Sequence, residues 1–175
     1  MKNEYRPLLL LSFIPVAFLT YLFHEFGHWV FGELTGNDMA MNLNYCWVKS
    51  GAFHTEKDAL ISSIGGPAFT IIQAFTALIV IEKWKTIHAY PVLYFAFFVR
   101  FFAVVFGGFM KQDEAAIALS LGIGKYTVAI IVLGVLFAMV FRGSHILKID
   151  LKGNLIYFAV STAAILSVIG VLSIF

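Results

Sequence analysis

The sequence predicts an all-α polytopic membrane protein with about five transmembrane helices and a small membrane-associated β-hairpin after the first. Hydrophobic residues fill 61% of the 175 positions and aromatic residues 17%, whereas charged residues make up only 13%. A soluble domain of this length has no use for so much apolar surface. Backbone polar groups in hydrocarbon must be paired internally, and the apolar segments lack the alternation of a membrane barrel, so the spanning elements are expected to be helices.

Five apolar stretches are candidates to cross a hydrocarbon core about 30 Å thick. They cover residues 7–34, 59–81, 89–110, 126–141 and 155–175, with four or six spans as alternatives. The fourth stretch is short, and the apolar segment 115–124 before it is either an interfacial helix or a continuation of the third span. The first stretch has no small-residue cleavage site, so it is interpreted as a retained helix and not as a signal peptide. The whole chain is expected to form one domain.

The segment between the first two spans predicts a hairpin over about residues 39–55. An apolar set at every second position, Met41, Leu43, Tyr45 and Trp47, has the period of a strand. Residues 49–51, with the sequence KSG, are expected to form the turn before a second short strand. The alternative is an ordered external loop.

The stretch FHEFGHWVF at residues 23–31 puts three ionisable side chains into the first predicted span. His24 and His28 are four residues apart, so on a helix they face one side and can offer two imidazole nitrogens to one metal ion. Glu25 projects in an adjacent direction, towards a water on that metal. Each ionisable group within a span costs roughly 2.5–3.5 kcal/mol or more, and HExxH on a helix is typical of zinc with a glutamate base. The competing interpretation is a polar cluster satisfied by hydrogen bonds between helices.

A catalytic zinc ion takes three protein ligands and keeps a fourth position open. His88 and His145 belong to loops on the opposite side of the membrane, so the third ligand must come from the hairpin side. Asp113 is the first candidate, because it follows the third span close to the membrane; Glu114 is the second and His54 the third. The competing interpretation of Asp113 and Glu114 is a solvated helix start, where acidic residues are favourable.

Together these features resemble the site-2 protease family of intramembrane zinc metalloproteases. The resemblance rests on HEFGH at residues 24–28, the strand-like segment after it, GGPAFT at 65–70 and the aspartate after the third span. It extends over about the first 115 residues. The family usually has asparagine where this chain has Thr70, and glycine where it has Glu114. The resemblance implies hydrolysis of peptide bonds in or near transmembrane segments of membrane-protein substrates.

The expected mechanism uses one Zn²⁺ ion. The ion would lower the pKa of its bound water and polarise the scissile carbonyl, while Glu25 takes a proton and passes it to the leaving amine. Thr70 is a candidate donor to the developing oxyanion, and Asn42 and Asn44, with Lys111 and Gln112, are candidates to line a wet entrance. The edge of the hairpin is expected to add an extended substrate segment as a further strand.

The orientation in the membrane is left open. The side of the N-terminus carries Lys2, Arg6, Lys83, Lys85, Arg142, Lys148 and Lys152, and the hairpin side carries Lys49, Lys57, Lys111 and Lys125. This excess favours a cytoplasmic N-terminus. The family geometry favours the reverse, with the zinc ion nearer the cytosol. Arg100, midway along the third span, is expected to face the interior of the bundle and to have a structural role.

The net charge of +2 indicates no nucleic-acid surface, so the expected partners are the lipid bilayer and membrane-protein or membrane-peptide substrates. The expected location is the plasma (inner) membrane of a prokaryote. Two other functions compete with proteolysis. One is a membrane metal-binding or ion-carrier protein, supported by His88 and His145 on the far side. The other is a relative that binds membrane proteins without cutting them, against which Glu25 argues because binding alone needs no base.

Overall fold

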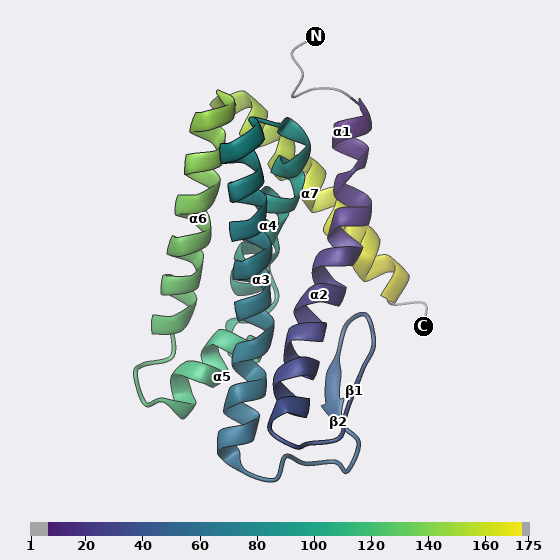
Figure 1. The fold of residues 1–175 in the computed structure, drawn as a ribbon, viewed down its shortest axis with the longest axis vertical. Helices are drawn as coiled ribbons and strands as arrows, with labels where there is room; N and C mark the ends of the chain where they lie inside the picture. The colour runs from purple at the N-terminus through teal and green to yellow at the C-terminus, as the bar shows by residue number, and fades with distance from the viewer. Residues whose placement is uncertain (1–6, 173–175) are drawn as a thin grey trace. The chain divides into compact units, whose positions relative to one another are not determined.

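The chain is a mainly helical, polytopic membrane protein, as a computed structural model shows for residues 7–172. Helices make up 78% of it. Five helical segments are long and apolar enough to cross a membrane: Pro7–Leu34, Glu56–Trp84, Ile87–Phe106, Thr127–Leu147 and Leu151–Leu172. The described part also contains a small antiparallel sheet after the first span (Figure 1). The predicted fold class is therefore confirmed.

The first span has the predicted bounds and consists of α1 (Pro7–Leu11) and α2 (Phe13–Leu34). Between them, the Ser12 hydroxyl donates to the Leu9 carbonyl at 2.6 Å, and the Ser12 amide keeps its bond to the Leu8 carbonyl. The helical path therefore continues through the interruption.

The second span, α3 (Glu56–Trp84), is longer than predicted by three residues at each end. The Thr55 hydroxyl oxygen accepts a hydrogen bond from the Asp58 amide at 3.2 Å, and Glu56 and Asp58 lie in the first turn. Acidic residues at a helix start and basic residues near its end are favourable, so the helix continues into its charged flanks. Hydropathy finds only the apolar part of such a helix.

The third span ends earlier than predicted. A 3₁₀ turn, η2 (Ile87–Ala89), leads into α4 (Tyr90–Phe106), and the helix stops at Gly107 and Gly108 instead of continuing to residue 110. Gly108 has a φ of +85°, a conformation that glycine adopts easily and other residues rarely. The backbone therefore turns away at this point.

The chain after this break resolves the ambiguous segment 115–124. The 3₁₀ turn η3 (Phe109–Lys111) precedes a separate short helix, α5 (Asp113–Ser120), which does not continue the third span. The fourth span, α6 (Thr127–Leu147), gains length at its C-terminal end. The fifth, α7 (Leu151–Leu172), begins four residues before the predicted start, and residues 173–175 lie outside the described part.

The sheet is a hairpin of β1 (Met39–Met41) and β2 (Cys46–Val48), attached to the end of α2. The Met39 amide donates to the Glu33 carboxylate at 2.9 Å, and the Met39 side chain lies against Gly32, where a Cβ would meet its sulfur. Met39 and Val48 are opposite one another and buried. The hairpin therefore has a fixed position relative to the helix that carries the two histidines.

The turn of this hairpin is not where the sequence pattern placed it. The Asn42 side-chain oxygen accepts from the amides of Asn44 and Tyr45, at 2.9 and 2.8 Å, and the Asn42 amide donates to the Tyr45 carbonyl at 2.9 Å. The prediction of one strand through residues 41–47 and a turn at 49–51 was wrong. An asparagine that binds the backbone two residues further on favours a turn over a strand.

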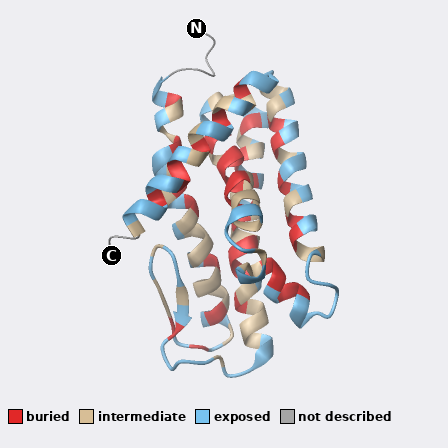
Figure 2. Cartoon of the chain, turned by 180° about the vertical axis from the view of Figure 1, so that it is seen from behind, coloured by how far each residue is buried: buried red, intermediate tan, exposed pale blue. Residues whose placement is uncertain are grey.

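By its contacts the chain forms two compact units, whose boundaries fall inside helices. Of the described residues, the first unit contains 7–20, 72–100 and 134–172, and the second contains 21–71 and 101–133. The helices combine buried and exposed residues along their lengths (Figure 2). Many of the exposed ones are large and apolar, such as Leu19 and Phe141, as lipid contact requires.

An aromatic cluster forms part of the core of the first unit. Phe13 and Tyr157 stack with ring centroids 5.5 Å apart, and Tyr90 and Tyr94 lie next to Tyr157. Both hydroxyls donate to Asn154: Tyr90 to its side-chain oxygen at 2.6 Å and Tyr94 to its backbone oxygen at 2.9 Å. These two tyrosine hydroxyls are thus paired, as buried polar groups usually are.

Candidate metal centre

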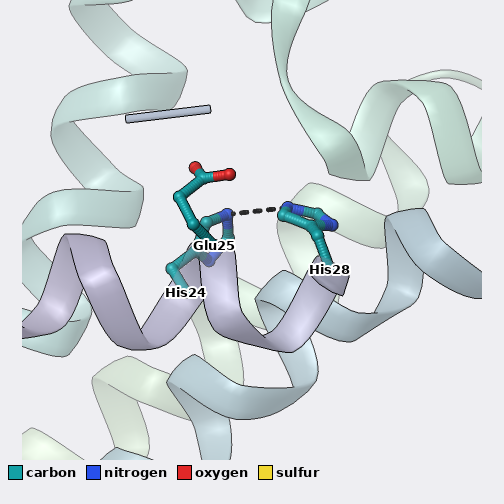
Figure 3. Close-up of side chains that lie close together, drawn as sticks. All are labelled: His24, Glu25 and His28. Carbon is teal, nitrogen blue, oxygen red and sulfur yellow. Dashed lines mark hydrogen bonds between the residues drawn. The ribbon is translucent and has the colours of Figure 1, made fainter. Parts of the chain in front are cut away.

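The candidate site lies within the second unit and begins with the two histidines of α2. Their rings lie side by side, as the helical spacing predicts (Figure 3). The Nε2 atoms of His24 and His28 are 3.2 Å apart, and the side chains are 11% and 12% exposed. Both side chains are therefore largely, but not completely, buried.

Asp113 completes a triangle of ligand atoms. Its Oδ2 atom lies 3.0 Å from Nε2 of His24 and 3.5 Å from Nε2 of His28. A zinc ion about 2.0–2.1 Å from each tetrahedral ligand needs ligand atoms about 3.3 Å apart. The sides of this triangle, 3.0, 3.2 and 3.5 Å, bracket that value. The three side chains therefore fit a tetrahedral zinc ion and leave its fourth position for another ligand.

Asp113 reaches the histidines because of the break after α4. The turn at Gly107 and Gly108 and the extended residue Gln112 end one helix and start another, and Asp113 is the first residue of α5. The Gln112 side chain donates back to the Gly108 carbonyl at 3.3 Å, which holds this corner together. A continuous third helix to residue 110 would have carried Asp113 onward along its own axis.

One face of α3 carries the residues that contact the histidine helix. Ser62, Gly65, Gly66 and Thr70 are all buried and follow one another at helical spacing. Gly65 lies against Gly27 of α2: a Cβ on either glycine would meet the backbone oxygen of the other. Small residues at helix crossings allow such close approach of two backbones in membranes.

The histidine rings rest on this face. A Cβ on Gly66 would meet Nε2 of His28, and would lie only 2.6 Å from Cε1 of His24. The second ring nitrogens are also in contact with α3: Nδ1 of His28 is 2.8 Å from the Ser62 carbonyl oxygen, and Nδ1 of His24 is 3.0 Å from the Thr70 hydroxyl oxygen. In return, the Ser62 hydroxyl donates to the His28 carbonyl at 3.0 Å.

Glu25 lies beside the histidines. One carboxylate oxygen and one nitrogen of each ring lie within 4.8 Å of one another, and Figure 3 shows the carboxylate on the same side of α2 as the rings. Glu25 and the two histidines could therefore hold a metal ion by themselves. The same carboxylate is also close enough to contact a molecule bound at the triangle of His24, His28 and Asp113.

The hairpin lies near the Glu25 carboxylate. Burial, and then the negative charge of Glu25, raises the pKa of the Cys46 thiol in β2 to about 11, so the thiol stays protonated at neutral pH. Alkylation of Cys46 by iodoacetamide should accelerate about tenfold per pH unit from pH 8 to pH 10, because only the thiolate reacts. A plateau near pH 9, as for an ordinary thiol with a pKa of about 8.5, would contradict this placement. The detergent-denatured chain is the control.

Other predicted site residues have different positions. Asn42 and Asn44 form the exposed hairpin turn. His54 is exposed, and its amide donates to the side chain of Asn37 at 3.0 Å. Glu114 follows Asp113 in α5 and is 1% exposed.

Thr70 is buried behind His24, 1% exposed, and its hydroxyl contacts the ring instead of an open surface. Lys111 lies in η3 on the exposed surface. Arg100, 5% exposed, is buried as the sequence predicts. His88 is exposed in η2, in the first unit, and His145 is exposed in α6 of the same unit.

Sequence reasoning missed Ser62 and the role of Gly66. A signal for both exists in the spacing of small and polar residues in an otherwise apolar helix, Ser62, Gly65, Gly66 and Thr70, which is typical of a helix-packing face. It also missed Asn37, which is 1% exposed and ties the segment after the hairpin to the end of α2. A lone asparagine in a loop gives no such signal.

The fold and this cluster define a class: a polytopic membrane protein with a histidine–carboxylate cluster on its first span. Comparison with protein-family models, with curated proteins and with solved structures gives no match.

Proposed function

We propose that this chain is an intramembrane zinc endopeptidase similar to the site-2 protease family. It would hydrolyse peptide bonds in or near transmembrane segments of membrane-protein substrates, in the plasma (inner) membrane of a prokaryote. The observation that supports the proposal best is the triangle of Nε2, Nε2 and Oδ2 atoms, with sides of 3.0–3.5 Å, on an apolar span. A hydrogen-bonded cluster also accounts for the single contact of His24 with Asp113, whereas a metal ion accounts for all three atoms lying within 3.5 Å of one another.

The residues divide into ligands and a base. His24, His28 and Asp113 would hold one Zn²⁺ ion, which supplies Lewis acidity and lowers the pKa of a water molecule. Glu25 lies beside these ligands, so its carboxylate can take a proton from the attacking water and later give it to the leaving amine. Because Glu25 would return this proton to the leaving amine, no proton has to cross a medium of low dielectric constant to enter or leave the site.

The hairpin supports an endopeptidase over a simple metal site. A helical substrate shields its peptide bonds, so cleavage needs an extended segment. In the described part of the chain β1 and β2 pair only with each other, so each has an edge without a neighbouring strand, and the charge of Glu25 acts on Cys46 of β2. Addition of a substrate strand to such an edge would supply the extended conformation close to the base. The anchoring of Met39 to Glu33 would keep that edge in place.

Metal content of the purified protein tests the ligand set. We expect about one zinc ion per wild-type chain, and loss of the metal in His24→Ala, His28→Ala and Asp113→Asn, because three ligands are needed to retain a catalytic zinc ion. Glu114→Gln is the matched control on the adjacent residue of α5 and should retain zinc. Mass spectrometry of the detergent-purified proteins measures the content.

Two results would contradict the proposal in different ways. If Asp113→Asn retains zinc and Glu114→Gln loses it, the third ligand is Glu114 and not Asp113, and the proposed activity is unaffected. No zinc in wild-type protein, even after zinc is supplied, would remove the basis for a metalloprotease.

A further inference from the structure

Each histidine of the triangle uses its Nδ1 atom for a contact with α3, and the partner determines where the ring hydrogen lies. Nδ1 of His28 is 2.8 Å from the backbone oxygen of Ser62. A carbonyl oxygen only accepts, so in the neutral ring Nδ1 carries the hydrogen. Nε2 of His28 then presents a lone pair, the form in which imidazole binds a metal.

For His24 the partner is a hydroxyl, which in general can donate or accept. The Thr70 hydroxyl donates to the Gly66 carbonyl, one turn earlier in α3, at 3.1 Å. With that hydrogen on Gly66, the Thr70 oxygen can accept from Nδ1 of His24 at 3.0 Å, which is the pairing that a metal ion on Nε2 of His24 requires. Thr70 is 1% exposed, so bulk water does not compete for these bonds. With a metal ion on Nε2, His24 therefore also carries its hydrogen on Nδ1. Without one, the Asp113 carboxylate oxygen, 3.0 Å from Nε2, accepts a ring hydrogen there.

We propose that Thr70 is a positioning residue, which fixes the tautomer and the orientation of His24 for metal binding. This inference rests on the proposed function, because it takes zinc as the ligand. It replaces the role expected from the sequence, because the Thr70 hydroxyl is buried behind His24 and its contacts are with Gly66 and the His24 ring. Loss of an oxygen partner behind a metal-binding histidine lowers metal affinity roughly 10–100-fold in other proteins.

Zinc affinity of Thr70 variants tests the proposal without any substrate. Thr70→Val keeps the shape of the side chain but removes the acceptor, so zinc affinity, measured by competition with a chromophoric chelator, should fall roughly 10–100-fold. Thr70→Ser restores the hydroxyl and should recover most of the affinity. Thr76→Val makes the same substitution at an exposed position of α3 and should leave the affinity unchanged. Thermal unfolding of the metal-free proteins shows whether each variant is folded.

A second measurement needs no variant at Thr70. Nitrogen-15 NMR of histidine-labelled protein should find, on addition of zinc, two rings that bind the metal through Nε2 and carry the hydrogen on Nδ1. Zinc bound through Nδ1 of His24, or wild-type zinc affinity in folded Thr70→Val, would overturn the role of Thr70. If wild-type protein itself binds no zinc, the proposed function fails; if wild type and Thr70→Val bind equally well, only the role of Thr70 fails.

Discussion

Glu25→Gln should lower peptide cleavage by roughly 10²–10⁴-fold while the bound zinc remains. The substitution keeps the size of the side chain and removes its ability to accept and return a proton. Zinc should remain, because the three ligand atoms of the triangle come from His24, His28 and Asp113. The measurement is cleavage of a membrane-protein substrate in detergent or liposomes, with zinc content determined on the same samples.

The control for this variant is Glu56→Gln, the same substitution at an exposed position in the first turn of α3. It should leave cleavage and zinc unchanged. Full cleavage by Glu25→Gln would exclude Glu25 as the base. The ion-carrier alternative predicts a different pair of results. The wild-type protein would bind zinc but cleave no peptide, and zinc transport would persist in Glu25→Gln, because transit of a metal ion needs ligands and no base.

The spans could be predicted from composition because the bilayer demands long apolar helices. The predicted ends of the helices are less accurate, because local effects other than hydropathy determine where a helix begins and ends. Acidic residues favour a helix start, so α3 begins at Glu56 outside its apolar part. Paired glycines stop α4 at Phe106 although Phe109 and Met110 are apolar. Hydropathy contains no information on either effect. The acidic residues at the start of α3 and the glycine pair after α4 are known start and stop signals of helices, and they predict both ends.

The position of the hairpin turn could also have been predicted from the sequence. Asparagine binds its own backbone two residues further on, and two asparagines separated by one residue, at 42 and 44, are a stronger turn signal than the KSG segment. The alternation at residues 41–47 is weak evidence for a strand, because so short a run can show a period of two by chance. The existence of a hairpin followed from the pattern, but its register did not.

Within the site, the sequence was informative where a residue type performs the chemistry directly. Histidines four apart and an adjacent glutamate have few other uses in a span, and the parity of spans brought Asp113 to the same side. Contacts that use the backbone could not be predicted: the Ser62 carbonyl orients His28, yet every residue has a carbonyl. The placement of Thr70 behind His24 depends on how two helices cross, which in turn depends on Gly27 and Gly65.

Gly66→Ala should abolish zinc binding and leave the fold intact. A methyl group at this position meets Nε2 of His28 and approaches Cε1 of His24 at 2.6 Å, so both rings must rotate away. Imidazole side chains can rotate, and alanine stabilises a helix by roughly 0.5–1 kcal/mol relative to glycine, so the loss of stability is small. The triangle, however, is lost. Zinc affinity should therefore fall by more than the roughly 10–100-fold typical of changes behind a ligand.

The neighbouring glycine provides the matched comparison, because its added methyl group meets atoms that cannot rotate. In Gly65→Ala the methyl meets the backbone of Gly27, so the helices must separate and unfolding should become easier by about 1–3 kcal/mol. In Gly134→Ala the methyl group points into open space, so zinc affinity should not change and the helix should gain only the roughly 0.5–1 kcal/mol of alanine over glycine. Zinc competition and thermal unfolding of all three variants separate the two effects. Wild-type zinc affinity in Gly66→Ala would mean that the histidine rings do not rest on α3, and the metal centre would have to be built in another way.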